Sequence, residues 1–184
     1  MVRHAEPAGT FTRPGSKLVG VLSDPLSRVA SMAIPHRVPI AHEPDYRTSH
    51  IGRYDDGQFF GSVTATMEQG SGGDDDWTRH KRWYAVLHRF DDDGAHTGSD
   101  IWFAGTSEDE NASIDRADAR LAEWLAALSG HVFDDIAIGL FQVEVDGHVF
   151  GLVDGSEDYD GEDHAEFLPD TLGFDPPWDG CYDT

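Results

Sequence analysis

Length, composition and charge narrow the class of protein. The chain has 184 residues, of which 39% are hydrophobic and 11% aromatic, as expected of one globular domain. Thirty-five acidic residues oppose thirteen basic ones, and the resulting formal net charge of -22 repels nucleic-acid backbones and anionic membrane surfaces. We therefore expect neither direct nucleic-acid binding nor membrane association. One cysteine, Cys181, excludes an internal disulfide and suits a reducing cytoplasm.

The charge is distributed unevenly along the chain. Residues 1–40 carry five Lys/Arg against two Asp/Glu, whereas the remainder carries eight against thirty-three. Proline and glycine punctuate the first segment, which shows no sustained periodicity. We predict a flexible N-terminal extension over residues 1–35, within which Met32 is an alternative start site, and a single α+β domain over residues 36–184.

Three Asp-Gly dipeptides predict β-hairpins, because this pair tolerates the positive φ angles of a type I′ turn. Asp56-Gly57 separates the predicted strands 50–55 and 58–67, Asp93-Gly94 separates 83–90 and 96–104, and Asp146-Gly147 separates 136–145 and 148–153. In the second hairpin a two-residue loop would place Tyr84, Val86, His88 and Phe90 opposite Phe103, Ile101, Ser99 and Thr97. In the third, Phe141, Val143 and Val145 would share a face with Leu152, Phe150 and His148.

One amphipathic helix is predicted between the second and third hairpins. Its apolar stripe comprises Ile114, Ala117, Leu121, Trp124, Leu125 and Leu128. Ser107 and Glu110 have the spacing of a capping box. We expect Trp124 to be buried against the strands. The order β-β-β-β-α-β-β predicts an α+β fold in which one helix packs on an antiparallel sheet of about six strands.

The C-terminal part contains an acidic loop and an aromatic, proline-rich tail. The loop, residues 154–163, resembles a calcium-binding loop, but the register places Ser156 where an aspartate is needed and Phe167 where a bidentate glutamate is needed. We therefore predict no metal site. The tail includes Phe174 and Trp178, and we expect it to pack on the domain, because exposing these rings together would leave an apolar patch.

Searches for reactive motifs give no candidate. The sequence lacks a nucleophile elbow, a phosphate-binding loop, a dinucleotide fingerprint, an H-E-x-x-H pair and a C-x-x-C pair. We therefore predict no catalytic residue and no cofactor. Groups that assemble only in space leave open an unrecognised enzyme or small-ligand binder, with its pocket between the sheet and the tail.

The candidate binding residues are Arg79, Lys81, Arg82 and Trp83, in the one dense basic cluster of the acidic domain, and Trp178 in the tail. Cations beside aromatic rings suit an anion or an acidic partner. The competing interpretation is a charged start to a buried strand, neutralised by the aspartates at positions 74–76. If a partner binds through an apolar interface instead, we expect the tail around Trp178 to contact it.

Several stretches resemble a group of small acidic actinobacterial proteins labelled formate hydrogenlyase regulatory protein HycA. They are Ile40–Arg47, Ile51–Phe60, His80–Phe90 and Pro176–Gly180. The resemblance implies a regulator that acts through proteins, and it carries over no site residues. Together with the charge, it leads us to expect a cytoplasmic regulatory or interaction protein with a basic protein partner. An immunity or antitoxin-like inhibitor of a basic enzyme is the alternative, and the oligomeric state stays open.

Overall fold

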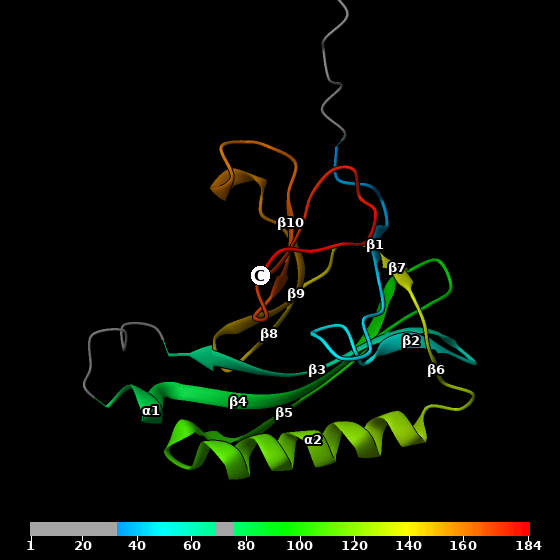
Figure 1. The fold of residues 1–184 in the computed structure, drawn as a ribbon. Helices are drawn as coiled ribbons and strands as arrows, with labels where there is room; N and C mark the ends of the chain where they lie inside the picture. The colour runs from blue at the N-terminus through cyan, green and yellow to red at the C-terminus, as the bar shows by residue number, and fades with distance from the viewer. Residues whose placement is uncertain (1–32, 69–75) are drawn as a thin grey trace, which may run out of the picture. The chain divides into compact units, whose positions relative to one another are not determined.

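The computed structural model describes residues 33–68 and 76–184 (Figure 1). Residues 1–32 of the predicted N-terminal extension lie outside this part, as do Asp74 and Asp75 of the acidic run before the basic cluster. Ile34 packs against the hydrophobic core just before the first strand.

The fold is α+β, and its strands form antiparallel sheets on which one long helix packs, as predicted. Three more elements are single helical turns, namely α1 (Trp77–His80) and two 3-10 turns, η1 (Ser107–Asp109) and η2 (Ser156–Asp158). The long helix is α2 (Glu110–Ala127). The strands are β1 (Val38–Ile40), β2 (Ile51–Tyr54), β3 (Gly57–Met67), β4 (Lys81–Phe90), β5 (His96–Thr106), β6 (Val132–Phe133), β7 (Ile136–Ile138), β8 (Val143–Val145), β9 (His148–Asp154), β10 (Ala165–Leu168) and β11 (Leu172–Phe174).

The central sheet has five strands in the order β5-β4-β3-β2-β6. Its β4-β5 hairpin has the predicted register at three positions. Tyr84, Val86 and His88 lie opposite Phe103, Ile101 and Ser99. At the turn the prediction is wrong, because an irregularity after Arg89 places Phe90 opposite His96 rather than Thr97. The connection is accordingly longer than an Asp-Gly turn.

The other two Asp-Gly dipeptides behave differently from each other. Asp146 and Gly147 have φ angles of 54° and 79° and form the predicted two-residue turn between β8 and β9. In the first hairpin Tyr54 pairs with Gly57, so the turn residues precede the glycine and Gly57 belongs to β3. Gly57 has a φ of 142°, and a Cβ there would lie 2.1 Å from the carbonyl oxygen of Phe90. Close approach of β4, rather than the turn, therefore requires this glycine.

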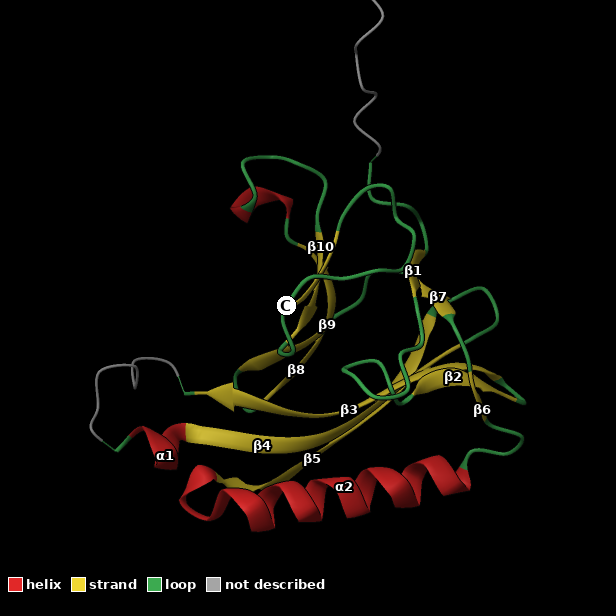
Figure 2. Ribbon diagram, viewed as in Figure 1, coloured by secondary structure: helices red, strands yellow, loops and turns green. Residues whose placement is uncertain are grey.

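Helix α2 covers one face of the central sheet, as Figure 2 shows. Its buried residues Ser113, Ala117, Leu121 and Leu125 follow each other at four-residue intervals and pack toward Phe59 and other residues of β3, β4 and β5. This stripe leaves Trp124 at its border, where the ring is only partly buried. The expectation that Trp124 is buried against the strands therefore holds only in part, because the ring packs on this core and stays partly exposed.

The opposite face of the central sheet is covered by a four-stranded sheet in the order β11-β10-β9-β8 (Figure 1). The ring of Phe60 in β3 stacks on that of Phe167 in β10, with 3.9 Å between their centroids. The predicted strand over residues 136–145 is interrupted, because β7 pairs with β1 while β8 pairs with β9. Trp178 is 9% exposed in the same core, so the aromatic tail packs down.

In residues 33–68 and 76–184, no helix combines the length and the apolar character that a membrane crossing requires.

Candidate functional site

The predicted basic cluster lies where α1 leads into β4, beside the start of α2. Arg79 forms ion pairs with Asp76 at 3.0 Å and Glu108 at 2.9 Å. Lys81 forms an ion pair with Glu110 at 3.0 Å, and its ammonium lies 4.6 Å from the centroid of the Trp83 ring. The first two cations of the cluster thus have carboxylate partners in this chain.

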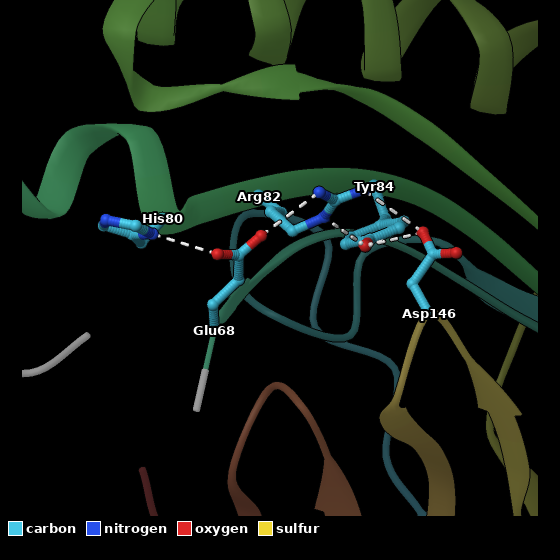
Figure 3. A network of polar contacts seen from close by, with 5 residues as sticks. All are labelled: Glu68, His80, Arg82, Tyr84 and Asp146. Carbon is cyan, nitrogen blue, oxygen red and sulfur yellow. Dashed lines mark hydrogen bonds and ion pairs between the residues drawn. The ribbon is translucent and has the colours of Figure 1, made fainter. Parts of the chain in front are cut away.

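Arg82 is the centre of a longer polar network, shown in Figure 3. Its Nε donates to Tyr84 Oη at 2.9 Å, and its terminal nitrogens approach Glu68 at 3.4 Å and Asp146 at 3.3 Å. The Tyr84 hydroxyl donates to the same Asp146 carboxylate at 3.2 Å, and His80 approaches Glu68 at 2.9 Å. The network therefore ties the end of β3 and the start of β4 to the β8-β9 turn.

These contacts explain the shifted protonation equilibria of the network. Burial raises the pKa of Tyr84 above its usual range, against the opposing effect of the Arg82 charge. The hydrogen bond to Tyr84 and the nearby carboxylates raise the pKa of Arg82. Both groups keep their protons at neutral pH, so the network is a fixed structural link.

The structure brings four of the five predicted binding residues together and leaves the fifth elsewhere. Trp83 Nε1 donates to Ser107 Oγ at 2.9 Å, and its ring packs against the core beneath α2. Trp178 belongs to the other core, on the opposite face of the central sheet. Since the cations of the cluster are paired with carboxylates of the same chain, the arrangement favours a charged start to β4 over an open anion site.

A groove that the sequence did not predict lies beside β3 where β2 begins, next to Ile51, and we call it the β3-edge groove. It consists of two adjoining hollows of about 260 Å³ and about 490 Å³ that share His50 and Asp118. The first is polar and is lined by Tyr46, Arg47, Ser62 and Asp170 among others. The second is mainly apolar, and its lining includes Leu121, Leu125 and Phe133.

Asp170 enters the polar hollow from the turn between β10 and β11. It is 9% exposed, and burial raises the pKa of its carboxyl group despite the opposing effects of the Thr64 and Ser62 hydroxyls and the Arg47 charge. Neither Asp170 nor Asp118 forms an ion pair with any residue that the structure describes. These carboxylates differ in this respect from those around the basic cluster.

Ser62 contributes an unsatisfied polar atom to the same hollow. The residue is 7% exposed, and its Oγ makes no hydrogen bond to the described parts of the chain, although the hydroxyl lies close enough to the Asp170 carboxyl group to oppose the rise in its pKa. A buried hydroxyl without a partner is unfavourable, and such groups are uncommon in native proteins unless they serve a ligand or an ordered water. Burial also lowers the pKa of His50 in this hollow, while the charge of Asp118 opposes that shift.

The groove can accept hydrogen-bond donors at one end and apolar groups at the other. The carboxylate oxygens and the Ser62 hydroxyl can accept hydrogen bonds from a donor such as an ammonium or guanidinium group. Leu121, Leu125 and Phe133 provide an apolar surface beside it, and Phe133 is 46% exposed. Within residues 33–68 and 76–184, no group of three or more His, Cys, Asp or Glu side chains is arranged to hold a metal ion.

Another polar cluster is centred on the buried His88. Ser99 Oγ lies 2.6 Å from His88 Nδ1 and 2.8 Å from His96 Nε2. Burial lowers the pKa of His88 to about 3, so this imidazole is neutral at pH 7. The rings of Phe141 and Phe167 pack on it, with centroids 4.8 Å and 5.8 Å away. A fully buried imidazole under aromatic rings has no access to a substrate, so His88 has a structural role.

The residues of the β3-edge groove escaped prediction because they are distant in sequence. His50, Asp118 and Asp170 come from three separate segments that only the tertiary fold brings together. In a chain with 35 acidic residues, single aspartates carry no signal. One local feature did point to an open strand edge. The predicted strand 58–67 is longer than its hairpin partner 50–55, and its second half, Ser62–Met67, is uncharged.

Comparison of the chain with models of protein families, with curated proteins and with solved structures found no match.

Proposed function

We propose that the chain is an acidic regulatory or protein-interaction protein that acts in the cytoplasm by binding a basic protein. The observation that carries this proposal is the use of its cations within the fold. Most arginines and lysines among residues 33–68 and 76–184 form internal ion pairs, namely Arg53, Arg79, Lys81, Arg82, Arg89 and Arg120. The excess of carboxylates therefore remains available to a partner.

Electrostatic complementarity of this kind speeds association and selects partners. A basic protein would meet a surface on which carboxylates outnumber free cations, whereas an acidic protein would be repelled. The expectation agrees with the regulatory role that the HycA-like resemblance implies. An immunity or antitoxin-like inhibitor of a basic enzyme is a narrower form of the same proposal, because it uses the same charge to block one particular target.

A pull-down at graded ionic strength tests the proposal. The tagged full chain is incubated with lysate of its source organism at 50 mM salt, and bound proteins are identified as salt is raised in steps. We expect basic proteins that dissociate as salt increases, because exposed charges are screened beyond roughly 8–10 Å near physiological ionic strength. The double substitution Arg79→Glu and Lys81→Glu should leave their capture intact. Loss of capture in this variant, or recovery of acidic proteins only, would contradict the proposal.

A second candidate function is small-ligand binding, with or without catalysis, in the β3-edge groove. Two features of the groove favour it. Burial raises the pKa of the Asp170 carboxyl group, as is common for groups in functional sites, and the Ser62 hydroxyl beside it has no hydrogen-bond partner in the described chain. A thermal-shift screen of small organic cations and neutral metabolites tests this reading. Stabilisation of the native chain that is abolished by Asp170→Asn and retained in the exposed-helix control Asp115→Asn would support it.

A further inference from the structure

The outer edge of β3 is open beyond Ile51, where β2 begins. Strand β3 pairs with β4 along nearly its whole length, but with β2 only from Gly57 to Phe60. The last hydrogen bond on this side runs from Gly61 N–H to the carbonyl oxygen of His50, at 2.8 Å. From Ser62 to Met67 no strand of the described chain lies next to β3 on the side away from β4.

The peptide groups of Val63 and Ala65 point toward this open side. Hydrogen-bonding direction alternates along an antiparallel strand, so these residues direct their N–H and C=O groups to the same side as Gly61. Neither residue makes a hydrogen bond on that side to residues 33–68 or 76–184. Both are partly exposed, and Met67 at the end of the strand is 41% exposed. Two donors and two acceptors are thus available to an added strand.

The last residues of β5, at the opposite edge of the central sheet, are protected by contacts from α2. On β5, the carbonyl oxygen of Ala104 accepts from Arg116 Nε and that of Thr106 accepts from Ser113 Oγ, each at 2.9 Å. Both donors belong to α2. Natural sheets protect their edges with such contacts, with charges or with very short strands. The run Ser62–Met67 contains no charged residue.

The charges around the open edge select the occupant. Where the edge begins, Asp45, Asp118 and Asp170 line the β3-edge groove together with one arginine, Arg47. Asp118 comes from α2, on one side of the strand, and Asp170 comes from the β10-β11 turn on the other side. A strand added to β3 would direct alternate side chains toward these two sides. A second copy of the chain is disfavoured, because each copy carries a net charge of -22.

We propose that the open edge of β3 is the docking surface for an extended basic segment of the partner, which adds as a strand and directs adjacent cationic side chains to Asp118 on one side and to Asp170 on the other. This inference rests on the proposed function. Main-chain hydrogen bonds to Val63 and Ala65 would hold the segment, and the pocket would select its sequence. The Ser62 hydroxyl would accept a hydrogen bond from the cation that meets Asp170.

Two synthetic peptides test the docking mode with the full chain. The first is a capped heptapeptide of three consecutive arginines flanked by two valines on each side, so that neighbouring arginines point to opposite sides of the strand. The second has the same sequence with every other backbone nitrogen methylated, which removes donors and keeps the charge. Binding is followed by calorimetry at 150 mM salt, and amide exchange by NMR. We expect the methylated peptide to bind at least tenfold more weakly. The Val63 and Ala65 amides should exchange freely alone and become protected with the first peptide.

Matched variants test the two cation positions. Asp118→Asn and Asp170→Asn should each weaken binding of the unmethylated peptide severalfold more than Asp115→Asn, which removes the same charge from an exposed position of α2 outside the groove. Equal affinity for both peptides would overturn edge docking while leaving the proposed function intact. Failure of both peptides to bind better than a neutral threonine-valine heptapeptide would instead reject the proposed function. Protection of Val63 and Ala65 that grows with protein concentration alone would assign the edge to a second copy.

Discussion

Substituting two buried serines should change stability in opposite directions. Ser62 is 7% exposed with an unpartnered Oγ, whereas Ser113 is fully buried, donates to the Thr106 carbonyl oxygen at 2.9 Å and accepts from Arg116 at 3.1 Å. An unsatisfied buried polar group costs about 1–3 kcal/mol, and a satisfied hydrogen bond contributes about 0.5–1.5 kcal/mol. The same chemical change therefore removes a penalty at one site and a favourable contact at the other.

The magnitudes follow from the surroundings of each residue. Ser62→Ala removes the penalty but loses some packing, so we expect the free energy of unfolding to rise by about 1 kcal/mol. Ser113→Ala loses two hydrogen bonds, partly offset by about 0.5 kcal/mol of better helix propensity, for a net loss of about 1 kcal/mol. The difference of about 2 kcal/mol corresponds to roughly 4–8 °C in Tm for a chain of this size.

Urea titration and calorimetry at pH 7 measure both variants against the unmodified chain. A destabilised Ser62→Ala variant would refute the reasoning, because it would mean that the hydroxyl bonds the Asp170 carboxylate in solution. If the prediction holds, the variant is more stable yet binds the basic heptapeptide less well. Such opposition between stability and binding is expected where a polar group is kept for a ligand.

Two further predictions concern the cores on either side of the central sheet. Leu121→Ala, at 1% exposure, should cost about 2–5 kcal/mol in a denaturant titration, whereas Leu140→Ala, at 43% exposure, should change stability by less than about 1 kcal/mol; similar losses would show that α2 does not cover the sheet in solution. The pKa of His88 is lowered from 6.5 to about 3, so the unfolded chain binds this proton more readily than the folded chain. Stability is therefore lost as the pH is lowered from about 6.5 to about 3, by about 5 kcal/mol in all. NMR of the imidazole should show a neutral ring at pH 5, and a midpoint near 6.5 would contradict the burial described for His88.

The hairpins and the helix could be predicted because they depend on residues close together in the sequence. Features that depend on contacts between distant segments could not be predicted. The Asp146-Gly147 turn forms as expected, because both residues accept positive φ angles without tertiary help. Gly57 was misassigned, because its need for glycine comes from the approach of the Phe90 carbonyl oxygen on a neighbouring strand. A sequence pattern carries no information about which backbone will lie against a given position.

The same distinction separates the predicted from the unpredicted part of the candidate site. The basic cluster is contiguous, and its position at the start of β4 was correctly anticipated. Its carboxylate partners Glu68, Glu108, Glu110 and Asp146 come from three other segments, so the sequence alone did not reveal that the cations were paired. The β3-edge groove depends on the length by which β3 exceeds β2, a property of pairing between strands.

The open edge of β3 also affects how the protein behaves at high concentration. The six residues Ser62–Met67 have the traits of cross-β segments, since they include valine and threonine and lack charge and proline. Repulsion between copies keeps such edges apart while the carboxylates are ionised. Acidification toward the isoelectric point near 4.4 removes this colloidal protection, and high salt screens it. The chain is thereby best stored dilute, at neutral pH and low salt, the conditions under which its self-repulsion is greatest.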